Sequence, residues 1–462
     1  MKTKNYFFIV FLSILFCITN QKAYSQCYNK IAVSQWQSAT IRTNGTLWIW
    51  GNNYYGQIGD GTLNGKDVPT QIGTSTNWQD IDVHLLHTIG VDNGGLFAWG
   101  KNDVGQLGNG TFIDKLVPTK IGAETNWKLA AAGKDYSLAI KINGTLWSFG
   151  LNSVGQLGTG NLFNSNVPIQ VGIDTNWLKV VAGSRQTIAL KTDGTLWVWG
   201  VATPLGGSSA GAMSIPTQIG VATNWKDISI FYEHALALTT DGTLWSWGFN
   251  SLGQLGTGNS STSTLNNNPQ QIGTSTWKHI SAGSHFSVAI KTNGTLWAWG
   301  LNDDGQYGNG TLISSTTPIQ IGTATNWRTV EAGYVHCLSK KVATDQLLVW
   351  GKDPFGVLGL GNVVPQLLPV VNGTCTTLDD VDFASNNNAV SIFPNPANFY
   401  ITIKTDDNAK INSIHIIDLL GKNVLTKHFD FDFVDVSLLK NGLYIIEIRT
   451  DKSNSFLKFI KN

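Results

Sequence analysis

The chain has 462 residues, only 13% of them charged, with a formal net charge of +1 and a sequence pI of about 7.7. This balance lacks the electrostatic footprint that binding to nucleic acid or to an anionic membrane needs, so we expect no nucleic-acid partner. The 50 glycines and 18 tryptophans are typical of a turn-rich, aromatic chain.

The first 25 residues have the pattern of a secretory signal peptide. Lys2 and Lys4 precede an apolar run, and Ala23-Tyr24-Ser25 supplies the small residues of a cleavage site. No other stretch approaches the roughly 18 to 20 apolar residues that cross a bilayer. We therefore expect an exported, soluble mature protein with no membrane span.

A motif related to Asn-Gly-Thr-Leu-Trp-x-Trp-Gly occurs seven times. Its final glycines are Gly51, Gly100, Gly150, Gly200, Gly248, Gly300 and Gly351. A period of this size indicates repeated supersecondary units that bury their apolar faces against one another. Each unit reads as four short apolar runs. Asn-Gly or Asp-Gly between the middle two favours a type I′ hairpin, and a proline such as Pro69 is expected to open the fourth strand.

Four strands in each of seven units predict an all-β, seven-bladed β-propeller over residues 26–375. Seventeen of the 18 tryptophans fall at positions that the repeat defines. Exposed indoles would suit sugar rings, but recurrence in every unit indicates packing between blades. Trp36 is the exception, because it lies in no repeat slot.

Three cysteines follow residue 25. Tyr28 aligns with the first-strand tryptophan of the other units, and in the common repeat frame Cys27 and Cys375 fall two residues apart. If the last blade meets the first, a Cys27–Cys375 disulfide would close the ring. Cys337, in a slot that holds Ser or Thr in several other units, would then be a buried thiol.

Three consecutive segments of the fifth unit, 234–238, 241–248 and 250–256, are similar to the regulator-of-chromosome-condensation repeat. The resemblance covers Cys27 to Cys375 and implies a seven-bladed propeller. That family includes a nuclear guanine-nucleotide exchange factor and a secreted β-lactamase inhibitor, so it leaves function open. Unit four departs from the pattern at Pro204–Gly207, and unit seven at Asp345-Gln346.

A polar linker at residues 376–388 precedes a change in composition, in which Trp disappears and Lys, Asp and Ile become frequent. Alternating runs such as Tyr400–Ile403 and Tyr444–Ile448 predict a small β-sandwich over residues 389–462. Its motifs resemble the C-terminal sorting domain of the type IX (Por) secretion system. They comprise Phe393, Pro394, Asn395, Pro396, Gly421, Lys422, Gly442 and Tyr444.

This second resemblance implies the type IX secretion machinery as a partner. It also implies export across the outer membrane of a Gram-negative bacterium, to the medium or to the cell surface. An ordinary adhesive sandwich is the alternative.

Motifs for catalysis are missing from the sequence. His87, His234 and His336 share one repeat slot in different units, which favours packed, hydrogen-bonded side chains over metal ligands. Asn302–Gly305 lacks the following Glu of a helix-flanked calcium loop. We find no nucleophile elbow, phosphate loop or zinc spacing, and expect no catalytic residues, metal or cofactor. A site assembled from distant loops would escape such a search.

Variable residues gather in the loops at one end of the expected propeller. Trp36, Tyr54, Tyr55, Tyr334 and Phe355 come from units one and seven, which are neighbours in a closed ring; Phe231 and Tyr232 come from unit five. Clustered Trp and Tyr are typical of a binding hot spot, although these rings could instead plug the channel mouth.

The sequence thus predicts a non-catalytic binding module for an unknown extracellular protein or glycan. The alternative is an extracellular enzyme, for instance a polysaccharide-active one, with its site at the channel mouth. The oligomeric state is not predicted.

Overall fold

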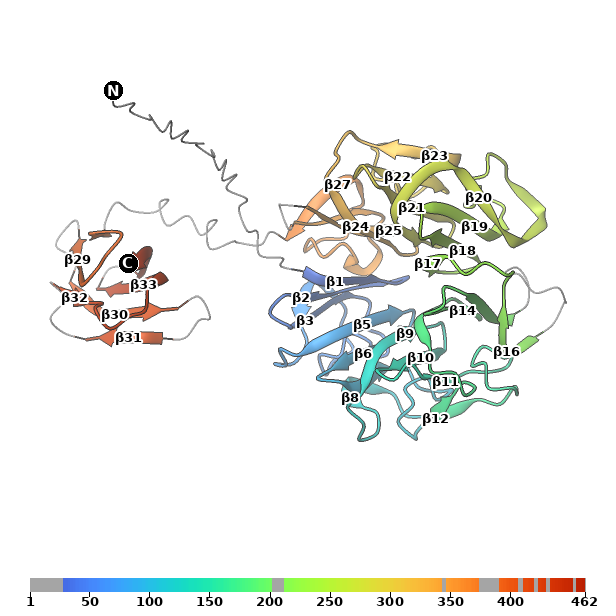
Figure 1. The fold of residues 1–462 in the computed structure, drawn as a ribbon, viewed down its shortest axis with the longest axis horizontal. Helices are drawn as coiled ribbons and strands as arrows, with labels where there is room; N and C mark the ends of the chain where they lie inside the picture. The colour runs from blue at the N-terminus through green and yellow to red at the C-terminus, as the bar shows by residue number, and fades with distance from the viewer. Residues whose placement is uncertain are drawn as a thin grey trace, which may run out of the picture. The chain divides into compact units, whose positions relative to one another are not determined.

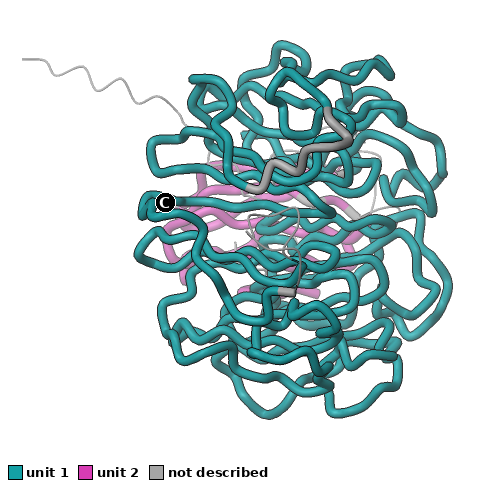
Figure 2. Tube along the Cα trace, turned by 90° about the vertical axis from the view of Figure 1, so that its right-hand side faces the viewer, with its two compact units in different colours: residues 1–375 teal, residues 376–462 magenta. Residues whose placement is uncertain are grey.

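The computed structural model describes residues 28–201, 212–342, 346–373, 390–405, 410–418, 423–428, 433–451 and 454–461. It divides the chain into two compact units, residues 1–375 and 376–462 (Figure 2). The signal peptide, Cys27, Cys375 and the linker lie outside the described residues, so the disulfide stays a prediction. The one helix within the described ranges is the 3-10 turn η1 (Pro354–Gly356), and no helix there is long and apolar enough to cross a bilayer.

The first unit is a β-propeller built from repeated antiparallel sheets. Five sheets have four strands each, in the orders β1-β2-β3-β4, β5-β6-β7-β8, β9-β10-β11-β12, β13-β14-β15-β16 and β24-β25-β26-β27. A sixth sheet has seven strands, β17 to β23, because the long β20 ends one repeat and begins the next. The sheets follow one another in chain order, and the first and last lie side by side (Figure 1). The blade number stays a prediction.

Each repeat begins with two central strands. The first strands are β1 (Tyr28–Val33), β5 (Trp78–His84), β9 (Trp127–Ala132), β13 (Trp177–Ala182), β17 (Trp225–Ile230), the end of β20 (Ser261–Ala282) and β24 (Trp327–Ala332). The second strands are β2 (Gln37–Arg42), β6 (His87–Asp92), β10 (Tyr136–Lys141), β14 (Gln186–Lys191), β18 (His234–Thr239), β21 (Phe286–Lys291) and β25 (His336–Lys341).

Two further strands complete each repeat. The third strands are β3 (Leu47–Gly51), β7 (Gly95–Gly100), β11 (Leu146–Gly150), β15 (Leu196–Val201), β19 (Thr243–Asn250), β22 (Leu296–Gly300) and β26 (Leu347–Gly351). The fourth strands are β4 (Lys66–Gln71), β8 (Lys115–Lys120), β12 (Ser165–Gln170), β16 (Ala212–Gln218), the start of β20, β23 (Ser315–Ile321) and β27 (Gln366–Gly373).

The turns between the second and third strands differ from the predicted type I′ form in most repeats. Among the turns that the structure describes in full, only that of the second repeat has positive φ at both central residues, Asn93 (48°) and Gly94 (72°). Elsewhere in the described residues only the glycine does, as at Gly45 (φ 76°), because Thr46 lengthens the loop by one residue. The extra residue favours a wider turn that ends in a glycine bulge.

The prediction that proline opens the fourth strand was also wrong. Pro69 lies inside β4, where the pairing with β3 is interrupted between the pairs Gly51↔Lys66 and Ile49↔Thr70. A ladder that is already broken at this point has no hydrogen bond for the missing N–H to remove.

The seam between the last and first repeats uses the same contacts as the internal seams. Trp50 Nε1 donates to the carbonyl of Val357 at 2.8 Å, as Trp350 Nε1 does to Gln306 at 2.8 Å. Gly361 N–H donates to the carbonyl of Asp67 in the first repeat at 2.8 Å, as Gly61 N–H does to the carbonyl of Leu116 in the second repeat at 2.9 Å. Residues from β1 and β3 share one buried core cluster with residues from β25 and β26. The ring is therefore closed by packing.

The repeat-slot histidines are buried hydrogen-bonding groups that join neighbouring repeats. His336 Nε2 contacts Ser38 Oγ at 3.0 Å across the closing seam, and that hydroxyl donates to the carbonyl of Val357 at 2.8 Å. The hydroxyl must therefore accept from Nε2–H, which places a ring proton on Nε2. His87 and His234 make equivalent contacts, both 2.9 Å, to Ser137 and Ser287.

The second unit contains two antiparallel sheets around one core. One sheet comprises β28 (Val390–Phe393), β29 (Tyr400–Thr405) and β32 (Val434–Asp435); the other comprises β31 (Asn423–Lys427), β30 (Ile411–Ile417), β33 (Gly442–Thr450) and β34 (Asn454–Lys461). The Asn395 side chain makes two hydrogen bonds of 2.9 Å with the backbone of β34: its Nδ2 donates to Lys458 O, and its Oδ1 accepts from Ile460 N–H. Gly421 and Lys422 lie outside the described residues.

The buried histidines should make the propeller less stable in acid. Burial lowers the pKa of His87, His234 and His336 from 6.5 to about 3. Their contribution is complete above pH 6.5 and is lost as the pH falls toward 3, because only the unfolded chain takes up the protons. Replacing His234→Gln should flatten the pH dependence of the unfolding free energy by up to about 1.4 kcal/mol per pH unit in this window.

Urea unfolding at several pH values checks this expectation. Tyr136→Phe is the matched control, because it removes a hydrogen bond from the same slot, to Gln186 O at 2.6 Å, without removing a histidine. It should lower stability equally at every pH of the series. An unchanged slope in His234→Gln would contradict the assignment.

Candidate functional site

Three aromatic side chains meet over the closing seam of the ring. Trp36 belongs to the β1–β2 loop, Tyr54 to the β3–β4 loop and Phe355 to η1. The Phe355 ring centroid lies 5.5 Å from that of Trp36 and 5.7 Å from that of Tyr54, both edge to face. Tyr54 is 63% exposed and Phe355 40%. We call these three residues the seam aromatic cluster.

The backbone holds the cluster in place on both sides of the seam. The carbonyl of Trp36 accepts from the N–H of Asn52 at 2.8 Å, and the side chain of Asn52 accepts from the N–H of Tyr54 at 3.1 Å. Gly51 makes this approach possible, because a Cβ at that residue would lie 2.3 Å from the Trp36 carbonyl oxygen. The rings therefore stand on loops that the third strands fix.

Phe355 has an unusual backbone conformation, with φ at 64°. Left-handed backbone is unfavourable for a bulky side chain and persists only where the surroundings impose it. Gly356 and Gly359, which follow Phe355, closely approach Asp67 and Trp50 of the first repeat. The strain is therefore held by the seam and places the Phe355 ring against Trp36.

The other predicted binding residues are not part of this cluster. Tyr55 lies beside Lys101, whose Nζ is 5.6 Å from its ring centroid. Tyr334 and Tyr232 pack against the core cluster that contains Phe231. Phe231 is only 7% exposed and stacks on His84, with centroids 5.9 Å apart. The burial of Phe231 fits the alternative that the sequence left open, in which the rings plug the channel mouth.

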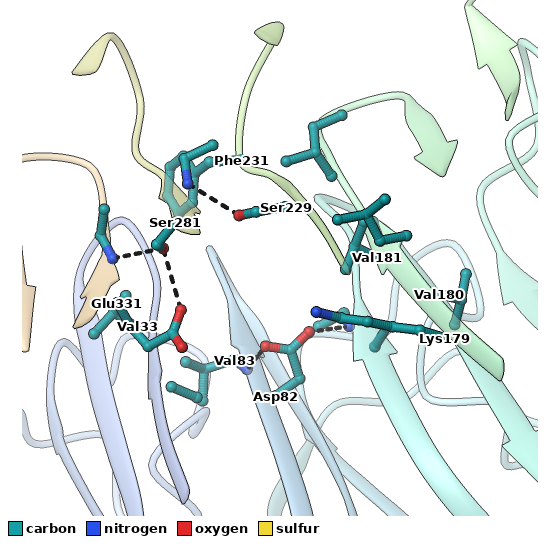
Figure 3. Close-up of a pocket in the computed structure, with 18 of the residues that line it drawn as sticks. Val33, Asp82, Val83, Lys179, Val180, Val181, Ser229, Phe231, Ser281 and Glu331 are labelled. Atoms are coloured by element: carbon teal, nitrogen blue, oxygen red, sulfur yellow. Dashed lines mark hydrogen bonds between the residues drawn. The ribbon is translucent and has the colours of Figure 1, made fainter. Parts of the chain in front are cut away.

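A cavity of about 200 Å³ that is open to solvent lies among the first strands. Asp82, Ser229, Ser281 and Glu331 project into it from four different strands (Figure 3). Motif analysis missed these residues because they meet only when the repeats close into a ring. Comparing first-strand slots across the repeats could have found them, since most of the equivalent residues are small or aliphatic.

The charges in this cavity are largely balanced among themselves. Lys30 pairs with Asp80, Lys179 with Asp227, and His279 with Glu331. Although burial alone would lower the pKa of His279, the Glu331 carboxylate raises it. Each of these three pairs links the first strands of two neighbouring repeats.

Asp82 is the most perturbed acid of the cavity. Burial raises its pKa to about 6, against the opposing effects of Lys30 and of hydrogen bonds from the N–H groups of Val83 and Ala132. Within the described part of the chain, no group of His, Cys, Asp and Glu side chains is placed to hold a metal ion.

A second buried acid, Asp353, lies two residues before Phe355 in the same loop. Asp353 is 2% exposed; its Oδ1 accepts from the N–H of Leu358 at 2.9 Å, and its Oδ2 has no hydrogen-bond partner. Burial raises the pKa of this carboxyl to about 6. Sequence reasoning missed Asp353, although it stands where five other repeats have Asn.

The strain at Phe355 can be measured with two variants that both remove the ring. Phe355→Gly should be more stable than Phe355→Ala by about 1 kcal/mol, because only glycine adopts the left-handed backbone without penalty. Urea unfolding of the two proteins gives the difference directly. Equal stability, or a more stable alanine variant, would mean that the backbone at residue 355 is unstrained.

Comparisons with known proteins agree with this architecture. Residues 44–91, 93–140, 143–190, 241–290 and 293–339 match the regulator of chromosome condensation (RCC1) repeat. A second description of the same repeat matches residues 225–254 and 277–306. Residues 391–462 match the secretion system C-terminal sorting domain, which indicates type IX export and a secreted or cell-surface location.

Relatives with similar sequences share only segments with the chain. Human HERC6, a probable E3 ubiquitin-protein ligase, is 33% identical over 119 residues, which is 25% of this chain and 12% of HERC6. The ultraviolet-B receptor UVR8 of Arabidopsis thaliana is 28% identical over 121 residues, 26% of this chain and 27% of UVR8. The matches thus cover a small part of each relative's length.

Solved structures show the same fold at low identity. Human WBSCR16 is 20% identical with a TM-score of 0.64, covering 71% of this chain and 94% of WBSCR16. Yeast RCC1 (Prp20), solved with Kap60 bound, is 20% identical with a TM-score of 0.63, covering 77% of this chain and 87% of its own. The chain belongs to the family of regulator of chromosome condensation (RCC1) repeat proteins and carries a secretion system C-terminal sorting domain at its end.

Proposed function

We propose that this protein is an extracellular, non-catalytic binding module that captures a protein or glycan partner through the seam aromatic cluster. The observation that carries the proposal is the arrangement of Trp36, Tyr54 and Phe355, which are edge to face, partly exposed and held on rigid loops. Preorganised aromatic rings give a large contact area at low entropic penalty, which is why Trp and Tyr dominate binding hot spots.

The chemistry around the cluster also favours aromatic contact over electrostatic attraction. The net charge is +1, and Lys352, three residues before Phe355 in the chain, is already paired with Asp304 at 2.8 Å. An incoming partner would therefore be recognised mainly by shape and apolar area. Tyr54 adds a phenolic hydroxyl, which suits either a peptide or a sugar.

We further propose an export route for this module. The signal-peptide pattern of residues 1–25 would direct the chain across the inner membrane of a Gram-negative bacterium, and residues 389–462 would direct it through the type IX machinery. An oxidising destination would allow the Cys27–Cys375 disulfide to add a covalent closure beside the packed seam. Cys337 is buried and stays a thiol in this proposal.

Removing two rings of the cluster should strongly weaken capture of the partner. We expect the full-length Trp36→Ala, Tyr54→Ala double variant to bind its partner at least about 30-fold more weakly, since a single hot-spot ring contributes about 2 kcal/mol. A pull-down from the extracellular fraction, quantified by mass spectrometry, and a glycan array measure the loss.

Phe163→Ala combined with Ile313→Ala is the matched control, because these side chains are 79% and 73% exposed on loops of other repeats. It should capture the partner as well as the parent does. Equal capture by the parent and the Trp36, Tyr54 variant would remove the proposed site.

Deleting residues 389–462 should stop export at the periplasm. The signal peptide is retained, so the propeller should accumulate there folded and be absent from the medium and the cell surface. Fractionation followed by immunoblotting measures the distribution, with the full chain as reference. An undiminished amount outside the cell would contradict the sorting role of this domain.

A further inference from the structure

The loop between the third and fourth strands carries a buried asparagine in five repeats and an aspartate in the last. The residues of this slot are Asn53, Asn102, Asn152, Asn250, Asn302 and Asp353. The exchange replaces an amide NH₂ group by a carboxyl oxygen. It occurs in the one loop that carries Phe355, so its consequence falls on the seam aromatic cluster.

The asparagine makes two kinds of hydrogen bond that close its loop. In the sixth repeat, Asn302 Oδ1 accepts from the N–H of Tyr307 at 2.9 Å. Its Nδ2 donates to the carbonyls of Thr311 at 2.9 Å and Ile313 at 3.2 Å, nine and eleven residues further on. Asn102 bonds its loop in the same way. One side chain thus ties together the two ends of the loop.

Asp353 keeps only the first of these bonds. Its Oδ1 accepts from Leu358 N–H, but its Oδ2, in place of the amide nitrogen, is buried without a partner. The turn that follows is the same in both repeats, since Gly359 N–H donates to Gly356 O at 2.9 Å as Gly308 does to Gly305 at 3.1 Å. The carbonyls at the corresponding offsets belong to Asn362 and Val364.

The protonation state of Asp353 decides whether its side chain can donate a hydrogen bond within the loop, as the amide of asparagine does. A carboxylate only accepts hydrogen bonds, so its buried, unpartnered Oδ2 loses its hydration without compensation. A neutral carboxyl carries one O–H, which can donate to a carbonyl as the amide of asparagine does. The two states therefore hold the loop with different strength.

We infer that Asp353 is a proton-dependent latch on the seam aromatic cluster: the neutral carboxyl holds the loop of residues 353–364 closed, and the carboxylate releases it. The inference rests on the proposed function, because it regulates the cluster to which Phe355 belongs. The left-handed backbone of Phe355 adds to the effect, since opening the loop relieves that strain.

The lysines near Asp353 are already paired with other acids, so protonation of Asp353 itself switches the latch. Strand β4 carries two charged residues, Lys66 and Asp67, and Lys66 is paired with Asp60 at 2.9 Å. Strands β3 and β27 carry no charged residue. Lys352 is paired with Asp304. Burial first, and Asp67 in addition, raise the pKa of Asp353 from 3.8 to about 6, against the bond from Leu358. The latch is therefore strongest below pH 3.8 and is lost as the pH rises through about 6.

Amide hydrogen exchange of the full-length protein tests the latch, with Asp353→Asn as the decisive variant. Five repeats show that asparagine fits the slot. In the parent, the opening constant reported by the Leu358 amide, corrected for intrinsic exchange, should rise by up to about tenfold per pH unit between pH 3.8 and 6. In Asp353→Asn the amide should stay protected throughout. The Tyr307 amide, bonded to Asn302, is the internal control and should not change in either protein.

Two results would overturn the latch: a flat profile at Leu358 in the parent, or a rise that persists in Asp353→Asn. Carbon-13 titration of the Asp353 carboxyl checks the assignment independently, and a midpoint near the ordinary value of 3.8 would also reject it. These measurements need no partner, so they can succeed when capture by the cluster fails. Conversely, capture that depends on Trp36 and Tyr54 while Leu358 exchange is flat would reject the latch alone.

Discussion

The closing seam is the constraint on which the rest of the propeller depends. A ring of repeats is stable only if its last member offers the first the same contacts that every internal pair makes. Here the bonds of Trp50 to Val357, of Gly361 to Asp67 and of His336 to Ser38 reproduce the internal pattern. Lys340 adds a contact specific to this seam, donating to the carbonyls of Tyr28 and Asn29 at 2.9 and 3.1 Å. Non-covalent packing therefore joins the two ends of the repeat array.

Much of this architecture could be predicted from the sequence because the repeat supplies seven readings of one pattern. Errors in one copy are corrected by the others, so the strands around Trp78 or Trp177 were placed reliably. The turn type was mispredicted because one extra residue, such as Thr46, changes the hairpin that Asn-Gly favours. The proline was misplaced because a break in the β3–β4 ladder is invisible in the order of residues.

The candidate site could be predicted only where ring closure alone determines proximity. Trp36 and Phe355 come from opposite ends of the repeat array, and register was enough to expect them as neighbours. The interior was harder to predict, because Asp82 and Glu331 line the same cavity only once the repeats have closed into a ring. Likewise, His84 stacks on Phe231 from the same slot of another repeat, where four other repeats have glycine, and no local pattern links them.

The two charged regions of the propeller differ in how well they follow the usual rules of polar pairing and backbone conformation. In the axial cavity almost every charge has a partner, which is what a buried network needs in order to be stable. At the seam, three rules are broken within three residues: an acid replaces the repeat's amide, its Oδ2 is unpartnered, and Phe355 has left-handed backbone. Natural chains concentrate such conflicts where function requires them. In the function that we propose, the paired interior is the scaffold, and the strained loop beside the exposed rings is where a partner and a proton would act on the same few side chains.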